Sequence, residues 1–213
     1  MRFTKQLLAG LLASAMLPAA VPAFAAEGRT NIALGKSYTI ESDAPNENSL
    51  GTTEEGGKDQ LTDGAYGTSE YYSGLWAHFV NAYGRTVTID LGASMSVDGI
   101  SMEFLQNKEH GVYCPRTLTV SLSENGTDFE TVATVEKPVS NTANGRIRVP
   151  YTADFKKARA RYVRVHFDVQ VNTFLDEIEV YGGALTDDAR PLAPTAPVEE
   201  ELYFDDGADI GVR

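Results

Sequence analysis

Apolar and polar residues alternate along short segments between residues 30 and 182. In one of them, Val87, Ile89 and Leu91 alternate with threonine and aspartate. The same period of two occurs at 100–104, 117–122, 162–167 and 177–180, and more weakly at 37–41, 129–135 and 145–150. A period of two with one apolar face is typical of half-buried antiparallel strands. The pattern therefore predicts about eight short strands and no long helix.

Asparagine–glycine pairs separate several of these segments. Asn125-Gly126 and Asn144-Gly145 each lie between two predicted strands. This dipeptide favours the tight turns that join antiparallel strands. We therefore predict an all-β fold for residues 30–182, an eight-stranded antiparallel jelly-roll β-sandwich.

The first 25 residues have a different composition. Arg2 and Lys5 precede an almost wholly apolar stretch at 7–23, and residues 23–25 have the small-x-small form of a cleavage site. This order is typical of a secretory signal peptide that is removed after Ala25. The apolar stretch is short for a spanning helix and contains two prolines, so a retained membrane anchor is the weaker alternative. We expect a secreted or cell-surface protein with no membrane insertion.

Residues 183–213 differ again. Pro191, Pro194 and Pro197 recur at every third position, and acidic residues accumulate from Glu199 onward. Regular prolines and like charges keep a chain extended. We predict an acidic linker or tail that leads to a downstream domain of the same protein. The alternative is a tail that itself binds a partner.

Charge and cysteine content exclude several classes of function. The 213-residue chain has a formal net charge of −12, which argues against nucleic acid as a partner, because such binding needs a basic surface. The single cysteine, Cys114, excludes an internal disulfide and a multi-cysteine zinc site. We expect it to be a small buried apolar residue. No Ser-His-Asp, zinc or phosphate-loop motif is present, and no pair of carboxylates stands out as a glycosidase pair.

Six motifs follow one another along the predicted domain. They are NIALGK at 31–36, LTDG at 61–64, VTIDLG at 87–92, SENGTDF at 123–129, ARYVRV at 160–165 and DEIEVYG at 176–182. In this order they resemble the discoidin family, also called F5/8 type C, which overlaps with carbohydrate-binding module family 32 in bacterial secreted proteins. The resemblance covers almost all of 30–182. It implies a galactose-binding-like fold, in which many members bind glycans through loops at one end.

The resemblance also implies a structural calcium ion. Its ligands would be the side chains of Asp63, Thr68 and Glu177 and the carbonyls of Gln60 and Ala65. Calcium accepts roughly six to eight oxygen ligands, so it could tie the N-terminal loop to the last strand. The alternative is an ordinary turn at Asp63 and a surface residue at Glu177. Where the family has a tryptophan two residues after the threonine, this chain has Glu70, which weakens the assignment of Thr68.

Candidate sugar-binding residues lie in three loop segments. An aromatic ring can cover the apolar face of a sugar while polar side chains bind its hydroxyls. The candidates are Tyr72, Trp76, His110, Tyr113, Arg116, Asn172 and Phe174, with Tyr72 and Tyr113 preferred as stacking platforms. Structural alternatives stay open: Trp76 in the core, His110 as a plain loop residue, and Arg116 in an ion pair.

Together these features predict a secreted noncatalytic carbohydrate-binding module, with a glycan or polysaccharide as partner and calcium as structural cofactor. The alternative is a structural or protein-adhesion domain of a secreted glycoside-processing enzyme, with no sugar site of its own. Exposure or burial of the loop aromatics distinguishes the two.

Overall fold

The computed structural model describes residues 28–44, 52–54, 60–81, 83–140 and 143–193. These residues form β1 (Tyr38–Ser42), β2 (Thr52–Glu54), η1 (Gln60–Thr62), β3 (Ala77–Val80), β4 (Arg85–Asn107), η2 (Lys108–His110), β5 (Thr117–Ser123), β6 (Glu130–Glu136), β7 (Arg146–Phe167) and β8 (Asn172–Ala184), where η is a 3-10 helix. The predicted signal peptide at 1–25 and the tail beyond residue 193 lie outside the described residues. Within the described ranges, no helix is long and apolar enough to cross a membrane.

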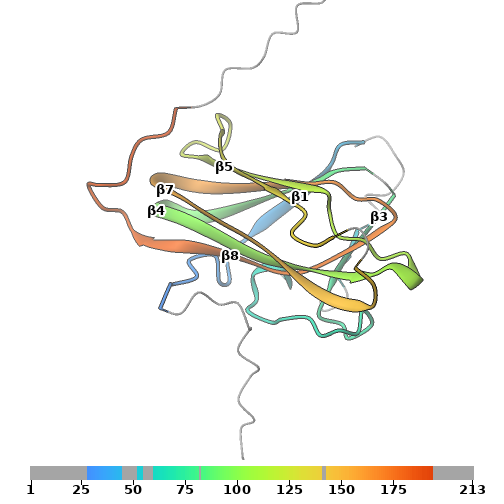
Figure 1. The fold of residues 1–213 in the computed structure, drawn as a ribbon. Helices are drawn as coiled ribbons and strands as arrows, with labels where there is room; N and C mark the ends of the chain where they lie inside the picture. The colour runs from blue at the N-terminus through green and yellow to red at the C-terminus, as the bar shows by residue number, and fades with distance from the viewer. Residues whose placement is uncertain (1–27, 45–51, 55–59, 82, 141–142, 194–213) are drawn as a thin grey trace, which may run out of the picture.

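Two long strands, β4 and β7, contribute to both layers of a β-sandwich (Figure 1). The first half of β4, at 85–90, pairs with β1 and with the second half of β7, which continues to β5 and β6. The second half of β4, at 95–107, pairs with the first half of β7 and with β8, which continues to β3 and β2. All of these pairs are antiparallel. The register shifts between Asp90 and Met95, which marks the place where β4 passes from one layer to the other.

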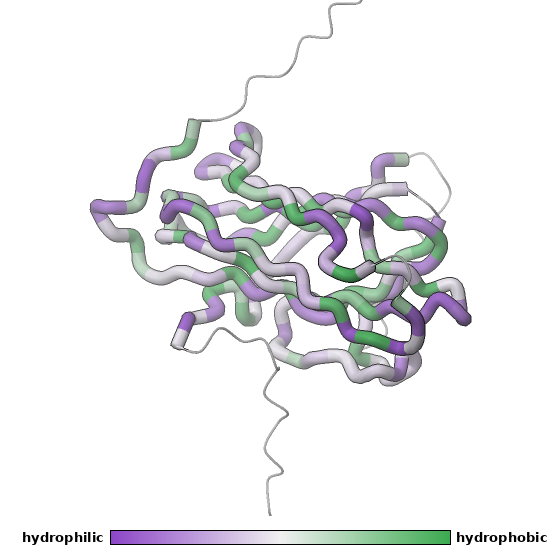
Figure 2. The backbone as a smooth tube through the Cα atoms, in the orientation of Figure 1, coloured by the Kyte–Doolittle hydropathy of each residue, from purple (hydrophilic) through white to green (hydrophobic). Residues whose placement is uncertain are grey.

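Because apolar and polar residues alternate along the strands, each layer has one apolar face, and the two apolar faces pack against each other. Ile89 of the first layer and Met102 of the second belong to one buried apolar cluster. Aromatic rings join the layers: the centroid of Phe167 lies 5.2 Å from that of Phe79 and 5.5 Å from that of Phe104, in edge-to-face geometry. Green and purple positions alternate along the strands in Figure 2, as half-buried strands require.

The antiparallel all-β fold is confirmed, but the predicted division of the chain into strands needs a correction. Seven strands form the hydrogen-bonded path β2-β3-β8-β4-β7-β5-β6, and β1 pairs with β4 beside it. The predicted segments 86–91 and 100–104 are a single strand, β4, while 145–150 and 162–167 are a single strand, β7. The irregular pairing that joins the halves interrupts the apolar alternation without ending the strand, so the pattern alone splits each strand in two. β2 and β3 were not predicted.

The ordered domain continues beyond the predicted boundary at residue 182. After β8 the chain runs along β7, where the Arg190 carbonyl accepts a backbone hydrogen bond of 2.9 Å. The Arg190 guanidinium binds both carboxylate oxygens of Glu130 in β6, at 2.6 and 3.0 Å. Leu192 packs against the core. Residues 185–193 therefore pack against the sandwich, and this part of the predicted linker belongs to the ordered domain.

The loop at 60–76 lies against the second layer, and its Leu61 packs in the main core. The backbone N–H of Gly67 donates a hydrogen bond of 2.9 Å to Asp176 in β8. The indole of Trp76 lies over Gly67 so closely that a Cβ there would be 2.2 Å from the ring, and only glycine fits. The loop thereby brings residues of both predicted sites to β8.

Candidate functional site

An open depression lies where three loops meet beside β3 and β8. Its volume is about 200 Å³, and it is lined by Tyr71, His78, His110, Val112, Asn172 and Phe174. The pairing of β3 with β8 sets His78 opposite Phe174. Backbone hydrogen bonds from Asn172 to Gly111, at 3.2 Å, and from Tyr113 to Asn172, at 2.8 Å, hold the segment after η2 beside the start of β8. Residues far apart in the sequence therefore converge here.

The polar groups of the depression are held in fixed orientations. Nδ2 of Asn172 donates to the Gly111 carbonyl at 3.2 Å, and its Oδ1 lies 2.9 Å from Nε2 of His78. Because an amide oxygen only accepts, Nε2 of His78 is the donor in this contact. Nδ1 of His110 lies 3.2 Å from Oδ1 of Asn107. Both imidazoles are thus oriented by an asparagine.

Aromatic rings supply the apolar part of the depression. His78 stacks on Phe174 with centroids 4.2 Å apart and planes 5° apart. The Tyr71 ring lies 5.7 Å from His110 and 5.8 Å from Phe174, between centroids. Trp76 packs with Phe174 in a small buried cluster that Tyr71 covers. The depression therefore combines ring surfaces with oriented hydrogen-bonding groups.

Three of the predicted sugar-binding residues line this depression, namely His110, Asn172 and Phe174. Tyr72 adjoins it, 66% exposed and edge-to-face with Tyr71 at 5.1 Å. Trp76 is 0% exposed, so it cannot act as a stacking platform. For Trp76 the assignment to a sugar site is corrected, and the alternative that places it in the interior is right.

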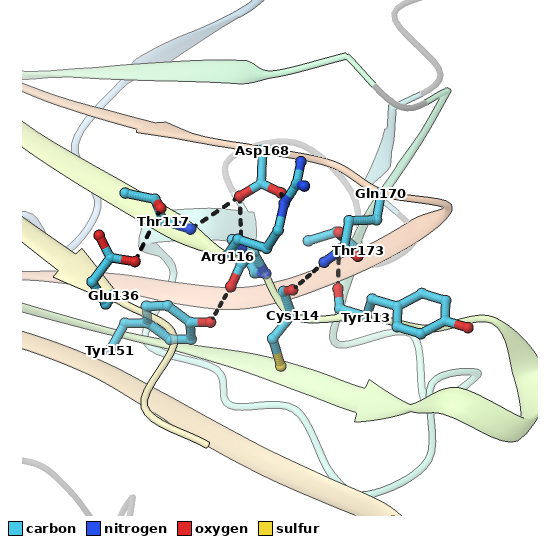
Figure 3. A network of polar contacts seen from close by, with 10 residues as sticks. Tyr113, Cys114, Arg116, Thr117, Glu136, Tyr151, Asp168, Gln170 and Thr173 are labelled. Atoms are coloured by element: carbon cyan, nitrogen blue, oxygen red, sulfur yellow. Dashed lines mark hydrogen bonds and ion pairs between the residues drawn. The ribbon is translucent and has the colours of Figure 1, made fainter. Parts of the chain in front are cut away.

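Tyr113 and Arg116 do not line the depression; Figure 3 shows them in a neighbouring polar network. The Tyr113 carbonyl accepts a hydrogen bond of 3.0 Å from the Thr173 hydroxyl, while its ring points away from the network. Asp168 accepts hydrogen bonds from Arg116 through the backbone N–H at 2.6 Å and Nε at 3.0 Å, and from the Thr117 N–H at 3.0 Å. The ion-pair alternative for Arg116 is therefore correct.

Sequence reasoning missed His78 and preferred Tyr72 to Tyr71. His78 lies between the buried residues Ala77 and Phe79, and this alternation was a usable signal of a short strand with a polar outward position. No comparable signal distinguishes two adjacent tyrosines in a loop, since the loop path decides which ring turns into the depression.

A buried carboxylate lies at the second predicted site. Glu177 is 1% exposed, so the alternative of a surface residue is wrong. Its Oε2 accepts a hydrogen bond of 3.2 Å from the Gly64 N–H, and its Oε1 has no hydrogen-bond partner. Burial, together with the charges of Asp63 and Asp176, raises the pKa of Glu177 to about 8. Such a carboxylate is costly to ionise unless a cation compensates it.

A register shift between β4 and β8 adds further acids. Glu103 of β4 faces both Asp176 and Glu177 of β8. Arg148 of β7 pairs with Glu103 and lies 4.0 Å from Asp176. Burial raises the pKa of Glu103, and it raises the pKa of Asp176 to about 7. The charges that act on Glu177 are acidic, so it is the least compensated of the three.

Asp63 lies near enough to Glu177 for its charge to act on that carboxylate. Asp63 is exposed, and one of its oxygens accepts the Ala65 N–H at 2.7 Å. Among the described residues, no group of three or more His, Cys, Asp or Glu side chains could hold a metal ion. A cation here therefore needs neutral oxygens as well. The unpartnered Oε1 of Glu177 is the observation that fits such an ion.

The side chains of the other predicted ligands, Gln60 and Thr68, contact residues other than Asp63 and Glu177. Gln60 is buried in η1, and its side chain donates to the Gly74 carbonyl at 3.4 Å. Thr68 is exposed, and its hydroxyl accepts the Glu70 N–H at 3.1 Å. The carbonyls of Gln60 and Ala65 stay predicted ligands.

Comparisons with known proteins agree with this architecture. A family model described as F5/8 type C domain matches residues 39–175. No curated protein matches the chain. The lectin domain of lectinolysin, solved in complex with Lewis B antigen, is 23% identical, with 73% of this chain and 98% of that chain covered and a TM-score of 0.51.

Two further solved structures are similar at lower scores. A Streptococcus pneumoniae fucose binding module is 22% identical over 73% of this chain and 97% of its own, with a TM-score of 0.49. Chitosan-binding module 1 of a chitosanase/glucanase from Paenibacillus sp. IK-5 is 23% identical over 72% and 99%, with a TM-score of 0.45. Since the family match spans well over half of the chain, the protein belongs to the F5/8 type C (discoidin) domain family and has its galactose-binding-like fold.

Proposed function

We propose that the protein is a noncatalytic carbohydrate-binding module whose glycan site is the depression lined by Tyr71, His78, His110, Asn172 and Phe174. One observation carries the proposal: ring surfaces and oriented imidazole and amide groups share one open depression of about 200 Å³. Sugars present an apolar C–H face and a ring of hydroxyls, and a site of this composition matches both.

The depression favours a neutral glycan. None of its lining side chains is an acid, lysine or arginine, so it offers no charged partner for a carboxylate or an amine. The formal net charge of −12 also disfavours acidic sugars at long range. The imidazole of His78 and the amide of Asn172 bind hydroxyls, and the ring of Tyr71 covers the apolar face of the sugar.

The lining also supports binding without catalysis. Most glycosidases place two carboxylates about 5–10 Å apart across the scissile bond. The buried acids lie instead around a separate cavity of about 20 Å³, which also touches Tyr66 and has room for about one water. No sugar ring fits between them.

Calcium is the proposed structural cofactor, held by Glu177 and Asp63 with carbonyls of the η1 loop and with Thr68 as a further candidate. The support is the buried and unpartnered Oε1 of Glu177. A cation there would compensate the acidic charge and join the 60–76 loop to β8. Because Tyr71 belongs to this loop, the ion would also stiffen the glycan site.

Secretion and attachment complete the proposal. The pattern at 1–25 supports export, and the proline-spaced acidic segment supports a connection to a further domain of the same protein. Fixed in this way, a module of modest affinity raises the local concentration of its partner domain at a polysaccharide or cell surface.

The test is binding of the full chain to a broad glycan array in millimolar calcium, with Lewis B, other fucosylated glycans and chitosan oligomers included. We expect hits that share one sugar, and a loss of affinity of tenfold or more for His110→Ala and Asn172→Ala. Arg116→Ala is the matched control, since Arg116 is an exposed polar residue outside the depression. An array without hits would favour a structural or adhesion domain instead.

A further inference from the structure

Tyr72 is an exposed aromatic side chain that the structure nevertheless holds in place. It is 66% exposed, more than any other large apolar side chain among the described residues. An exposed side chain on a loop normally keeps its rotamer freedom, because freezing it costs conformational entropy. Contacts that fix such a ring therefore need a reason.

The hydroxyl of Tyr72 lies beside the ion pair that joins Glu70 to Arg146, the first residue of β7. Its interaction with the carboxylate of Glu70 is the first cause that lowers the pKa of Glu70. Arg146 holds the same carboxylate, with Nη1 2.6 Å from each oxygen. The backbone N–H of Glu70 is bound in turn by the Thr68 hydroxyl at 3.1 Å. A charge-assisted pair thus fixes the outer end of the ring.

The ring of Tyr72 is fixed at its inner side by Tyr71. The two centroids are 5.1 Å apart, and the planes meet at 81°. Tyr71 itself contacts His110 and Phe174, which line the proposed glycan site. Tyr72 therefore lies one ring away from the depression, oriented by two partners and open to solvent over most of its surface.

We propose that Tyr72 forms a second subsite beside the depression, so that the protein binds a neutral oligosaccharide of at least two units rather than one terminal sugar. This inference rests on the proposed glycan site. A ring that is already immobilised loses little entropy when a sugar stacks on it, so its contact adds directly to affinity. The Glu70–Arg146 pair is satisfied internally, so the subsite presents a stacking surface without net charge.

The test compares monosaccharides with matched longer sugars by titration calorimetry of the full chain in millimolar calcium. The pairs are galactose and lactose, fucose and 2′-fucosyllactose, and N-acetylglucosamine and its β-1,4 dimer. For the pair that binds, we expect the longer sugar to bind about tenfold more tightly, which is 1.4 kcal/mol. Tyr72→Ala should remove this advantage, whereas His110→Ala should weaken both members of the pair.

Three further variants sharpen the test. Tyr72→Phe keeps the ring but loses its anchor, and Glu70→Gln weakens the anchor from the other side, so both should keep only part of the tenfold advantage. Leu185→Ala removes another exposed apolar side chain at the opposite end of β8 from Asn172, and it should change neither affinity.

Two results would overturn the inference while leaving the glycan site intact. One is equal affinity of the wild-type protein for both members of every pair that binds. The other is a Tyr72→Ala variant that keeps the full advantage of the longer sugar or loses affinity for both sugars alike. Absence of any binding by the wild-type protein would instead overturn the glycan site together with its second subsite.

Discussion

Glu177→Gln tests the buried carboxylate directly, because glutamine has nearly the same shape as a protonated glutamate and keeps an oxygen for the Gly64 N–H. In wild-type protein without metal, burial raises the pKa of Glu177 from 4.5 to about 8. Between these two pH values the folded state binds one more proton than the unfolded state. The contribution of this group to the free energy of unfolding is largest below pH 4.5 and is lost as the pH rises through about 8.

The magnitude follows from the same shift. Between pH 4.5 and about 8, each pH unit corresponds to about 1.4 kcal/mol of unfolding free energy. The upper bound for the loss of stability over this whole range is therefore about 5 kcal/mol. In chelator at pH 9, we therefore expect Glu177→Gln to be more stable than wild type by about 2 kcal/mol or more. At pH 4.5 the two proteins should unfold alike. With calcium at about 100 times its Kd, wild type should gain about 2.7 kcal/mol at pH 8 and the variant nothing.

Urea unfolding followed by the fluorescence of the single tryptophan, Trp76, provides the assay, since that indole is fully buried. The midpoint urea concentration should move at constant m value. Glu109→Gln, an exposed substitution in η2, is the control and should follow wild type at every pH. Identical pH profiles for wild type and Glu177→Gln in chelator would refute the reasoning about the uncompensated carboxylate.

Four further outcomes are expected. Asp63→Ala should abolish the rise in melting temperature that calcium causes and change the metal-free melt little; an unaltered calcium response would exclude Asp63 as a ligand. Gly67→Ala should cost about 1–3 kcal/mol and shift the emission of Trp76, because the new methyl group meets the indole. Arg190→Ala should cost about 1 kcal/mol and speed proteolysis within 185–193, because the two hydrogen bonds from Arg190 to Glu130 are lost. Tyr113→Ala should leave glycan affinity unchanged in the array; a clear loss would extend the site beyond the depression.

Much of the sandwich was predictable because period-two alternation is a local property. The segments 117–122 and 129–135 appear as β5 and β6 almost at their predicted bounds. Asp63 and Glu177 were named as calcium ligands from the motifs that resemble the discoidin family, and that assignment stays a prediction. Cys114 is buried as expected, and burial raises the pKa of its thiol to about 12, so it stays protonated and unreactive.

The fold class, the alternating faces and the residue types available for a site follow from neighbours along the chain, so local patterns were enough to predict them. Which of those residues meet depends on the tertiary structure. The pairing of β3 with β8 sets His78 against Phe174, the indole of Trp76 packs on Gly67, and the ring of Tyr71 contacts His110. These contacts join positions far apart in the sequence, so no local pattern encodes them, and the choice between Tyr71 and Tyr72 could be made only in three dimensions.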